Sequence, residues 1–146
     1  MIKALNHIAI TVKNLNESID WYRDKFGFKL VSKHQYQDMY FALISLKKIK
    51  IELFCFNKTT KPLPDYRKKL MDDLIVIGTK HVCFEVDNLD LMVSKLHNQK
   101  VDIIGEQDTS AFGGRYIFIK DCNGILIELY EFKFTLLQNN PLAEKN

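Results

Sequence analysis

The sequence predicts an α+β fold made of two tandem copies of one βαβββ unit, and two repeated segments carry this prediction. The segment that begins at His7 reappears at His81, 74 positions later. The segment around Glu52 reappears around Glu128, 76 positions later. A loop insertion of two residues explains the difference, and two matches at nearly one spacing indicate an internal duplication.

The first copy has the pattern of a strand, a helix and three further strands. Apolar residues alternate over 4–12, and a helix is predicted over 17–26 with Asn16 as its N-cap. Gly27 suits the position after the helix, where a left-handed backbone ends it. Residues rich in Phe, Ile, Leu and Tyr predict strands at 28–36, 39–46 and 49–56.

The second copy repeats this order. A strand is predicted at 79–87 and a helix at 89–98. Three strands follow at 101–106, 115–120 and 125–131. The Asn-Gly pair within 121–124 predicts a tight turn before the last strand, because these residues tolerate positive φ.

The duplication also divides the chain into parts. These are a first module at 1–57, a connector at 58–78, a second module at 79–134 and a polar tail at 135–146. The connector does not repeat, and a short helix is predicted over 65–74. Two interpretations of it stay open: a lid over a functional site, or a linker helix that covers a sheet edge.

The composition excludes several classes of protein. The 146 residues are 47% hydrophobic and 27% charged, as expected of a globular protein, and no apolar run approaches the ~20 residues that span a bilayer. The N-terminus lacks a signal-peptide pattern, so we expect a cytoplasmic protein. The net charge of +3 comes from scattered lysines and arginines, which does not predict a nucleic-acid surface.

The three cysteines do not predict a disulfide framework or a catalytic thiol. They are odd in number and form no CxxC pair. Cys55 and Cys83 lie within apolar runs, so both are predicted to be buried packing thiols.

Two glutamates in apolar strands are the first sign of a functional site. Glu52 and Glu128 each stand between apolar neighbours and face away from them. Burying a carboxylate is unfavourable unless it is paired or binds a cation. With His7 and His81 they give one imidazole and one carboxylate per copy, ligands that suit a divalent transition metal. The alternative is that these are solvated or hydrogen-bonded side chains.

Several segments of the chain resemble the vicinal oxygen chelate superfamily, which includes glyoxalase I, bleomycin-resistance proteins, extradiol dioxygenases and methylmalonyl-CoA epimerases. The resemblance extends from residue 4 to 132. The segments that carry it are 5–12 (LNHIAITV), 18–22 (SIDWY), 26–30 (FGFKL), 78–86 (GTKHVCFEV) and 118–129 (FIKDCNGILIEL).

The resemblance implies two modules whose curved sheets form a cup around a metal ion. It places His7, Glu52, His81 and Glu128 at the four ligand positions of enzymes like glyoxalase I, for nickel, zinc, cobalt or manganese. The dioxygenases have His and the epimerases generally Gln where Glu52 stands, so Glu52 favours the glyoxalase pattern. Glu128 or Glu52 is then expected to leave the metal and move a proton next to a carbonyl, through a metal-bound enediolate.

The function that we predict is a metal-dependent lyase or isomerase of the glyoxalase I type, acting on a small molecule. Lactoylglutathione lyase activity is weakly supported, since Thr11 and Phe56 stand where bacterial glyoxalase I has its Arg and Asn for glutathione. Two alternatives stay open: a metal-free ligand-binding protein of the bleomycin-resistance kind, and an epimerase of an acyl thioester. We also expect a homodimer, with no nucleic-acid or membrane partner.

Substrate contacts are predicted from four further residues. Arg115, after a flexible Gly-Gly pair, is the candidate for an anion contact, with a plain surface arginine as the alternative. Tyr40, Phe54 and Tyr116 are candidates for an aromatic pocket, with core packing as the alternative.

Overall fold

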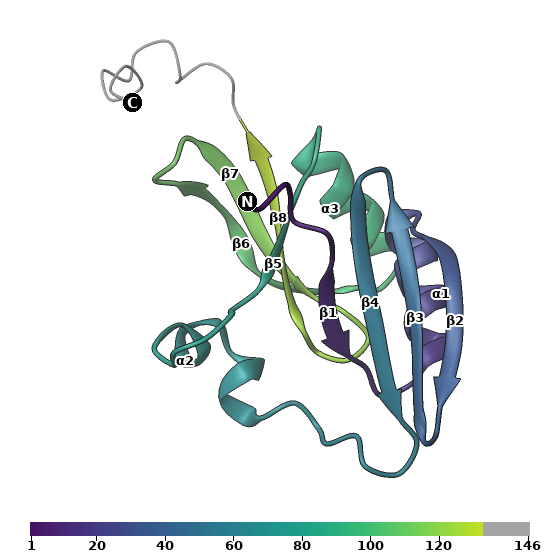
Figure 1. Ribbon diagram of the computed structural model, residues 1–146. Helices are drawn as coiled ribbons and strands as arrows, with labels where there is room; N and C mark the ends of the chain where they lie inside the picture. Colours follow the sequence, from purple (N-terminus) through teal and green to yellow (C-terminus); the bar gives the residue numbers. More distant parts are fainter. Residues whose placement is uncertain (133–146) are drawn as a thin grey trace. The chain divides into compact units, whose positions relative to one another are not determined.

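The computed structural model describes residues 1–132, so the predicted polar tail at 135–146 lies outside the described residues. The chain forms two compact units. The first contains Met1–Tyr66 together with Cys122–Gly124, and the second contains Arg67–Asp121 and the chain from Ile125. Each unit holds one four-stranded mixed sheet (Figure 1).

The first unit follows the predicted order of strand, helix and three strands. Its elements are β1 (Ile8–Thr11), α1 (Leu15–Phe26), β2 (Lys29–Tyr36), β3 (Met39–Leu46) and β4 (Ile49–Phe56). The sheet order is β1-β4-β3-β2, with β1 parallel to β4 and the other neighbours antiparallel. The strand β1 is shorter than the predicted 4–12: Ile8–Thr11 pairs with β4 in register, and the Val12 N–H adds one bond to the Phe54 carbonyl oxygen.

The helix α1 begins two residues earlier than predicted. Its N-cap is Asn14, whose Oδ1 accepts hydrogen bonds from the backbone N–H groups of Asn16 (3.0 Å) and Glu17 (3.2 Å). Asn16 is therefore the second helical residue, and the prediction of Asn16 as the cap was wrong. Gly27 ends the helix with φ of 84°, as predicted.

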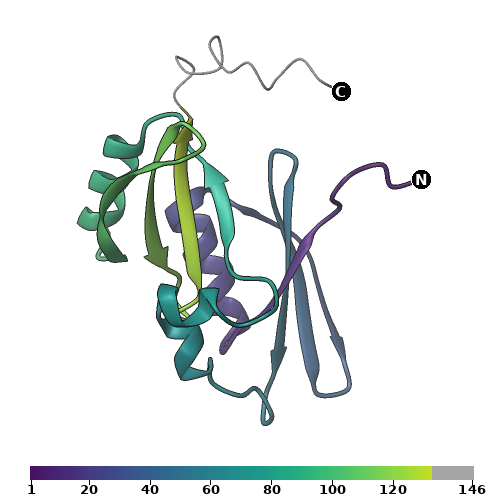
Figure 2. The same cartoon turned by 90° about the vertical axis from the view of Figure 1, so that its left-hand side faces the viewer.

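The core of the first unit lies between α1 and one face of its sheet. In β4 the buried residues alternate as Ile51, Leu53 and Cys55, so Glu52 and Phe54 point to the opposite face. The helix contributes Leu15 and Tyr22 to this core and runs along the sheet (Figures 1 and 2). Cys55 is thus a buried packing thiol, as predicted.

The second unit repeats this architecture. Its elements are β5 (Val82–Glu85), α3 (Leu89–Asn98), β6 (Asp102–Ser110), β7 (Gly114–Lys120) and β8 (Leu126–Phe132), in sheet order β5-β8-β7-β6. Again the first strand, β5, is parallel to the last strand, β8. The α+β class with two tandem βαβββ modules is therefore confirmed.

Two strands of the second unit differ in length from the prediction. The strand β5 covers Val82–Glu85, so it is shorter than 79–87, and His81 precedes the strand. The strand β6 continues to Ser110, beyond the predicted end at 106. A register shift between Ile104 and Asp108 accommodates Gly105, which has φ of 74°, and pairing resumes after it.

The connector forms a 3₁₀ turn at Asp65–Lys68 and the helix α2 at Leu70–Leu74. Asp73 is buried, and its carboxylate lies 3.6 Å from Arg67 Nε and 3.8 Å from Lys80 Nζ. The Lys80 ammonium also donates to the Asp73 and Val76 carbonyl oxygens. Arg67 donates to the carbonyl oxygens of Thr79 and Lys80, so these charges anchor the connector to the residues just before His81.

Replacing Asp73 is expected to weaken the second unit. Asp73→Asn leaves two cations facing a buried neutral amide, and we expect the free energy of unfolding to fall by about 2 kcal/mol in urea titrations. Asp72→Asn is the matched control, because the Asp72 side chain is half exposed and pairs with exposed Lys69 at 3.7 Å. Equal stability of the two variants would contradict an anchoring role for Asp73.

No helix within residues 1–132 is both long enough and apolar enough to span a membrane.

Candidate metal centre

The first unit pairs His7 with Glu52. His7 Nε2 lies 3.4 Å from Glu52 Oε2, and the other ring nitrogen, Nδ1, lies 2.9 Å from the side-chain oxygen of Asn6. Glu52 is in the middle of β4, opposite Ala9 of β1, while His7 comes just before β1. Both side chains are partly exposed, at 41% and 27%.

The second unit pairs His81 with Glu128 in the same way. His81 Nε2 lies 2.9 Å from Glu128 Oε2, and the side chains are 22% and 16% exposed. The Phe118 ring meets the imidazole edge-on, with 5.0 Å between ring centroids. His81 Nδ1 is buried and has no hydrogen-bond partner among residues 1–132.

The geometry of each pair fits a shared cation. Two ligands about 2.1 Å from one ion and roughly 90–109° apart are about 3.0–3.4 Å from each other. The observed separations of 3.4 Å and 2.9 Å are close to this range. Within residues 1–132, however, no group of three or more His, Cys, Asp or Glu side chains is gathered tightly enough to hold a metal ion. The four-ligand centre therefore stays a prediction.

Cys83 is not the buried packing thiol that the sequence predicted. Cys83 is exposed, and it lies opposite Glu128 in the pairing of β5 with β8. Although the residue is exposed, its thiol is partly desolvated beside the carboxylate. This desolvation and the charge of Glu128 raise the pKa of Cys83 to about 12, so the thiol is protonated at neutral pH.

We call the side of each sheet that carries Glu52 or Glu128 its glutamate face. In the first unit Phe54 lies on this face, as expected of a pocket residue, and its ring is 6.0 Å from that of Phe41. Tyr40 does not lie there: it pairs with Cys55, which is buried under α1. Because side chains alternate along a strand, the neighbouring residue Phe41 lies on the glutamate face instead of Tyr40.

Two further residues of this face, Phe41 and His34, were not predicted from the sequence. Phe41 and Tyr40 are adjacent in one apolar strand, so the sequence alone does not show which of them points to the glutamate face. His34 pairs with Phe41 across β2 and β3, with 5.3 Å between ring centroids. Which face each of these residues occupies relative to Glu52 depends on how β2, β3 and β4 pair. The sequence alone does not show this register.

In the second unit Tyr116 lies on the glutamate face, because it pairs with Tyr130, two residues after Glu128. Its hydroxyl donates to Asp108 Oδ2 at 3.4 Å, and the charge of Asp108, with partial burial, raises the pKa of Tyr116. Phe118, opposite Glu128, and Tyr130 share this face and were not predicted. Tyr130 is two residues after Glu128, and Phe118 is two residues after Tyr116. This spacing within each strand could have indicated that they share a face.

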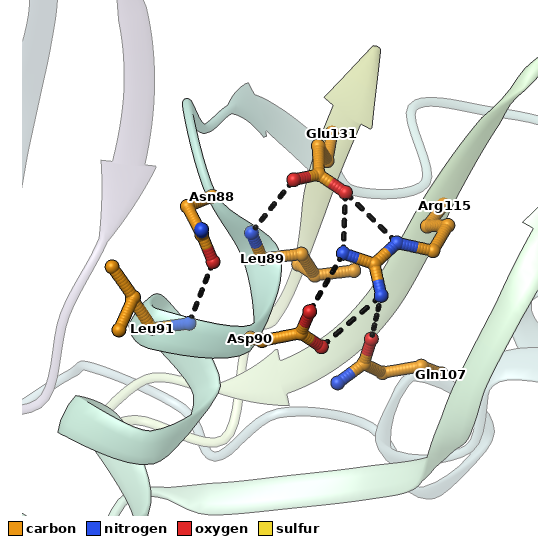
Figure 3. Close-up of polar contacts among 7 residues, drawn as sticks. All are labelled: Asn88, Leu89, Asp90, Leu91, Gln107, Arg115 and Glu131. Atoms are coloured by element: carbon orange, nitrogen blue, oxygen red, sulfur yellow. Dashed lines mark hydrogen bonds and ion pairs between the residues drawn. The ribbon is translucent and has the colours of Figure 1, made fainter. Parts of the chain in front are cut away.

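Arg115 lies on the other face, so its prediction as an anion contact is corrected. It pairs with Glu131 across β7 and β8, and its guanidinium donates to Glu131 Oε2 at 2.6 and 2.8 Å (Figure 3). It also donates to both carboxylate oxygens of Asp90, at 3.0 and 3.1 Å, and to Gln107. These carboxylates raise the pKa of Arg115.

The Arg115 cluster has a structural role. Asp90 is in the first turn of α3, and the Leu89 N–H donates to Glu131 Oε1 at 3.4 Å (Figure 3). The guanidinium thus joins the start of α3 to β7 and β8, and its donors are already directed to protein acceptors. We therefore leave Arg115 out of the candidate site.

The two βαβββ units have the architecture of a glyoxalase-type fold, and comparison with known proteins agrees. The model of the Glyoxalase/Bleomycin resistance protein/Dioxygenase superfamily matches residues 4–129, and the chain belongs to this superfamily.

Individual relatives extend the comparison. The chain is 31% identical to the mitochondrial methylmalonyl-CoA epimerase of Mus musculus, over 86% of this chain and 71% of that one. It is 32% identical to the corresponding epimerase of Dictyostelium discoideum, over 89% and 79%. A glyoxylase/bleomycin resistance protein/dioxygenase domain from Frankia sp. EAN1pec superposes with a TM-score of 0.74 at 19% identity, covering 92% and 95%.

Proposed function

We propose that the protein is a metal-dependent enzyme that moves a proton at the carbon next to a carbonyl group, most specifically an epimerase of an acyl thioester. The observation that carries this proposal is the repeated His–Glu pair, one in each unit, with 3.4 Å and 2.9 Å between nitrogen and oxygen. The relatives named methylmalonyl-CoA epimerase support the thioester as the substrate class.

The proposed ligands are His7, Glu52, His81 and Glu128. A bound divalent ion would act as a Lewis acid that polarises the substrate carbonyl and so acidifies the neighbouring C–H bond. Each imidazole would contribute a nitrogen to such an ion, and each glutamate a carboxylate oxygen.

The two glutamates are also the proposed acid and base. Inverting a carbon centre requires one group to remove the proton and another to return a proton to the opposite side. Glu52 and Glu128 supply two such carboxylates. The protonated Cys83 thiol beside Glu128 has no counterpart beside Glu52, where Ala9 stands, so the two carboxylates differ in their surroundings.

One observation favours a second candidate, a lyase of the glyoxalase I type. The ligand position in β4 is held by Glu52, a carboxylate, rather than by the amide that the resemblance associates with epimerases. Both candidates share the proton transfer next to a carbonyl, and they differ in the substrate.

Metal content and turnover test this proposal together. The protein is purified without chelator, loaded with nickel, zinc, cobalt or manganese, and analysed for metal per chain. We expect one ion per chain; two would show that each pair binds its own ion. Sedimentation of the same sample tests the predicted homodimer.

Two substrates then separate the candidate activities. Solvent-deuterium incorporation into methylmalonyl-CoA, followed by NMR, would establish an epimerase. Turnover of the hemithioacetal of methylglyoxal and glutathione alone would establish the lyase. A protein that retains no metal after loading and turns over neither substrate would refute both candidate activities. This result would favour a ligand-binding protein.

A further inference from the structure

Tyr130 occupies a distinctive place on the glutamate face of the second unit. It is two residues after Glu128 on β8, so both side chains point to the same side of the sheet, with their Cα atoms about 7 Å apart. Across the ladder it faces Tyr116, while Phe118 faces Glu128. Tyr130 therefore lies on the same face as the proposed ligand Glu128, and its ring extends from there toward Gly114, the residue opposite Phe132.

The ring of Tyr130 lies against Gly114, which also explains the glycine. A Cβ atom at Gly114 would come within 2.6 Å of Tyr130 Cζ and 2.7 Å of Cε1, far inside van der Waals contact. The absence of a side chain at this position makes room for the end of the ring that carries the hydroxyl.

The Tyr130 hydroxyl makes no hydrogen bond that would stabilise the described part of the fold. It is buried and has no hydrogen-bond partner among the described residues. A buried polar group without a partner is rare and destabilises the fold, so this hydroxyl calls for an explanation. The Tyr116 hydroxyl, by contrast, is bound to Asp108.

Comparison of the two units shows that the architecture does not require this hydroxyl. The residue two positions after Glu52 is Phe54, which lies on the glutamate face of the first sheet. A phenylalanine thus fills the corresponding position of the same βαβββ unit. The hydroxyl is an addition in the second unit, on the side that carries Glu128.

We propose that the Tyr130 hydroxyl binds the substrate by donating a hydrogen bond to one of its oxygens, a bond that no side chain or backbone group of residues 1–132 accepts. This inference rests on the proposed function and names a specificity residue for it. A site built to bind a substrate oxygen discriminates strongly, because its polar group is left unpaired with any molecule that lacks the acceptor.

Removal of the hydroxyl alone tests the inference. Tyr130→Phe keeps the ring against Gly114, and we expect kcat/KM for methylmalonyl-CoA to fall about 10- to 100-fold at unchanged metal content. Tyr36→Phe is the control for activity, since Tyr36 is 64% exposed at the end of β2. A value for Tyr130→Phe within twofold of wild type would overturn the inference.

A measurement on the substrate-free protein is independent of the enzymatic activity. If the hydroxyl is unpaired, Tyr130→Phe will unfold at the same or a higher temperature than wild type. Tyr116→Phe, which loses the bond to Asp108, will unfold at a lower temperature. Equal destabilisation by both substitutions would show that the Tyr130 hydroxyl has a structural partner, and would overturn the inference.

Failure of the proposed function is recognised separately. If wild type does not turn over methylmalonyl-CoA, its binding is measured by calorimetry. Binding that Tyr130→Phe weakens about tenfold refutes the epimerase and supports the binding role of the hydroxyl. Absence of binding by wild type overturns both.

Discussion

Glu128→Gln is expected to abolish metal retention and to lower turnover on the order of a thousand-fold, with the fold intact. The amide has nearly the shape of the carboxylate but no negative charge, and it cannot exchange a proton at neutral pH. The Glu128 Oε2 atom faces His81 Nε2 at 2.9 Å, so the substitution also removes the anionic partner of the imidazole. Elemental analysis and deuterium incorporation measure the two effects.

The matched control is Glu131→Gln, in the same strand. Glu131 points to the opposite face and binds Arg115 and the start of α3, so its loss weakens the fold without touching a proposed ligand. We expect Glu131→Gln to retain the metal content of wild type. Unchanged metal stoichiometry in Glu128→Gln would refute the four-ligand centre, whatever its turnover.

The fold was largely predictable because the duplication constrains both copies at once. An assignment of strands and helix to one copy had to fit the equivalent residues of the other copy as well. The predicted bounds of the helix at 89–98 agree with the structure at both ends. Cap and strand ends were less predictable. Asn14 and Asn16 are equally good capping residues in sequence, and only backbone geometry shows that Asn14 accepts the N–H groups.

The candidate site was predictable only where alternation within a single strand determines which face a residue occupies. Alternation within a strand correctly separates Glu52 from Leu53 and Glu128 from Leu129. The face of Tyr40 depends on how β3 pairs with β4, and a slip of one residue exchanges it with Phe41.

Arg115 illustrates a related difficulty. Its partners Asp90 and Glu131 are 25 and 16 residues away, on different elements, so the ion pairs appear only after the unit has folded. Tyr130 was missed for a different reason. Its unpaired hydroxyl is a property of the packed structure and leaves no trace in the sequence pattern.

Gly114→Ala is expected to lower the free energy of unfolding by about 3 kcal/mol, which is at the upper end for overpacking. The new Cβ would lie 2.5 Å from the carbonyl oxygen of Glu131 and 2.6 Å from the Tyr130 ring. The backbone oxygen belongs to the ladder between β7 and β8 and has little freedom to move, so the strands must separate or the ring must turn away. Urea titration monitored by circular dichroism measures the loss.

The control, Gly105→Ala, separates steric overlap from backbone strain. Gly105 has φ of 74° and open space around it, so alanine there introduces only the left-handed strain of about 1–2 kcal/mol. If Gly114→Ala loses no more stability than Gly105→Ala, the Tyr130 ring is not confined by Gly114. A larger loss of stability, accompanied by reduced turnover at retained metal content, would show that substrate binding requires the Tyr130 ring to lie over Gly114.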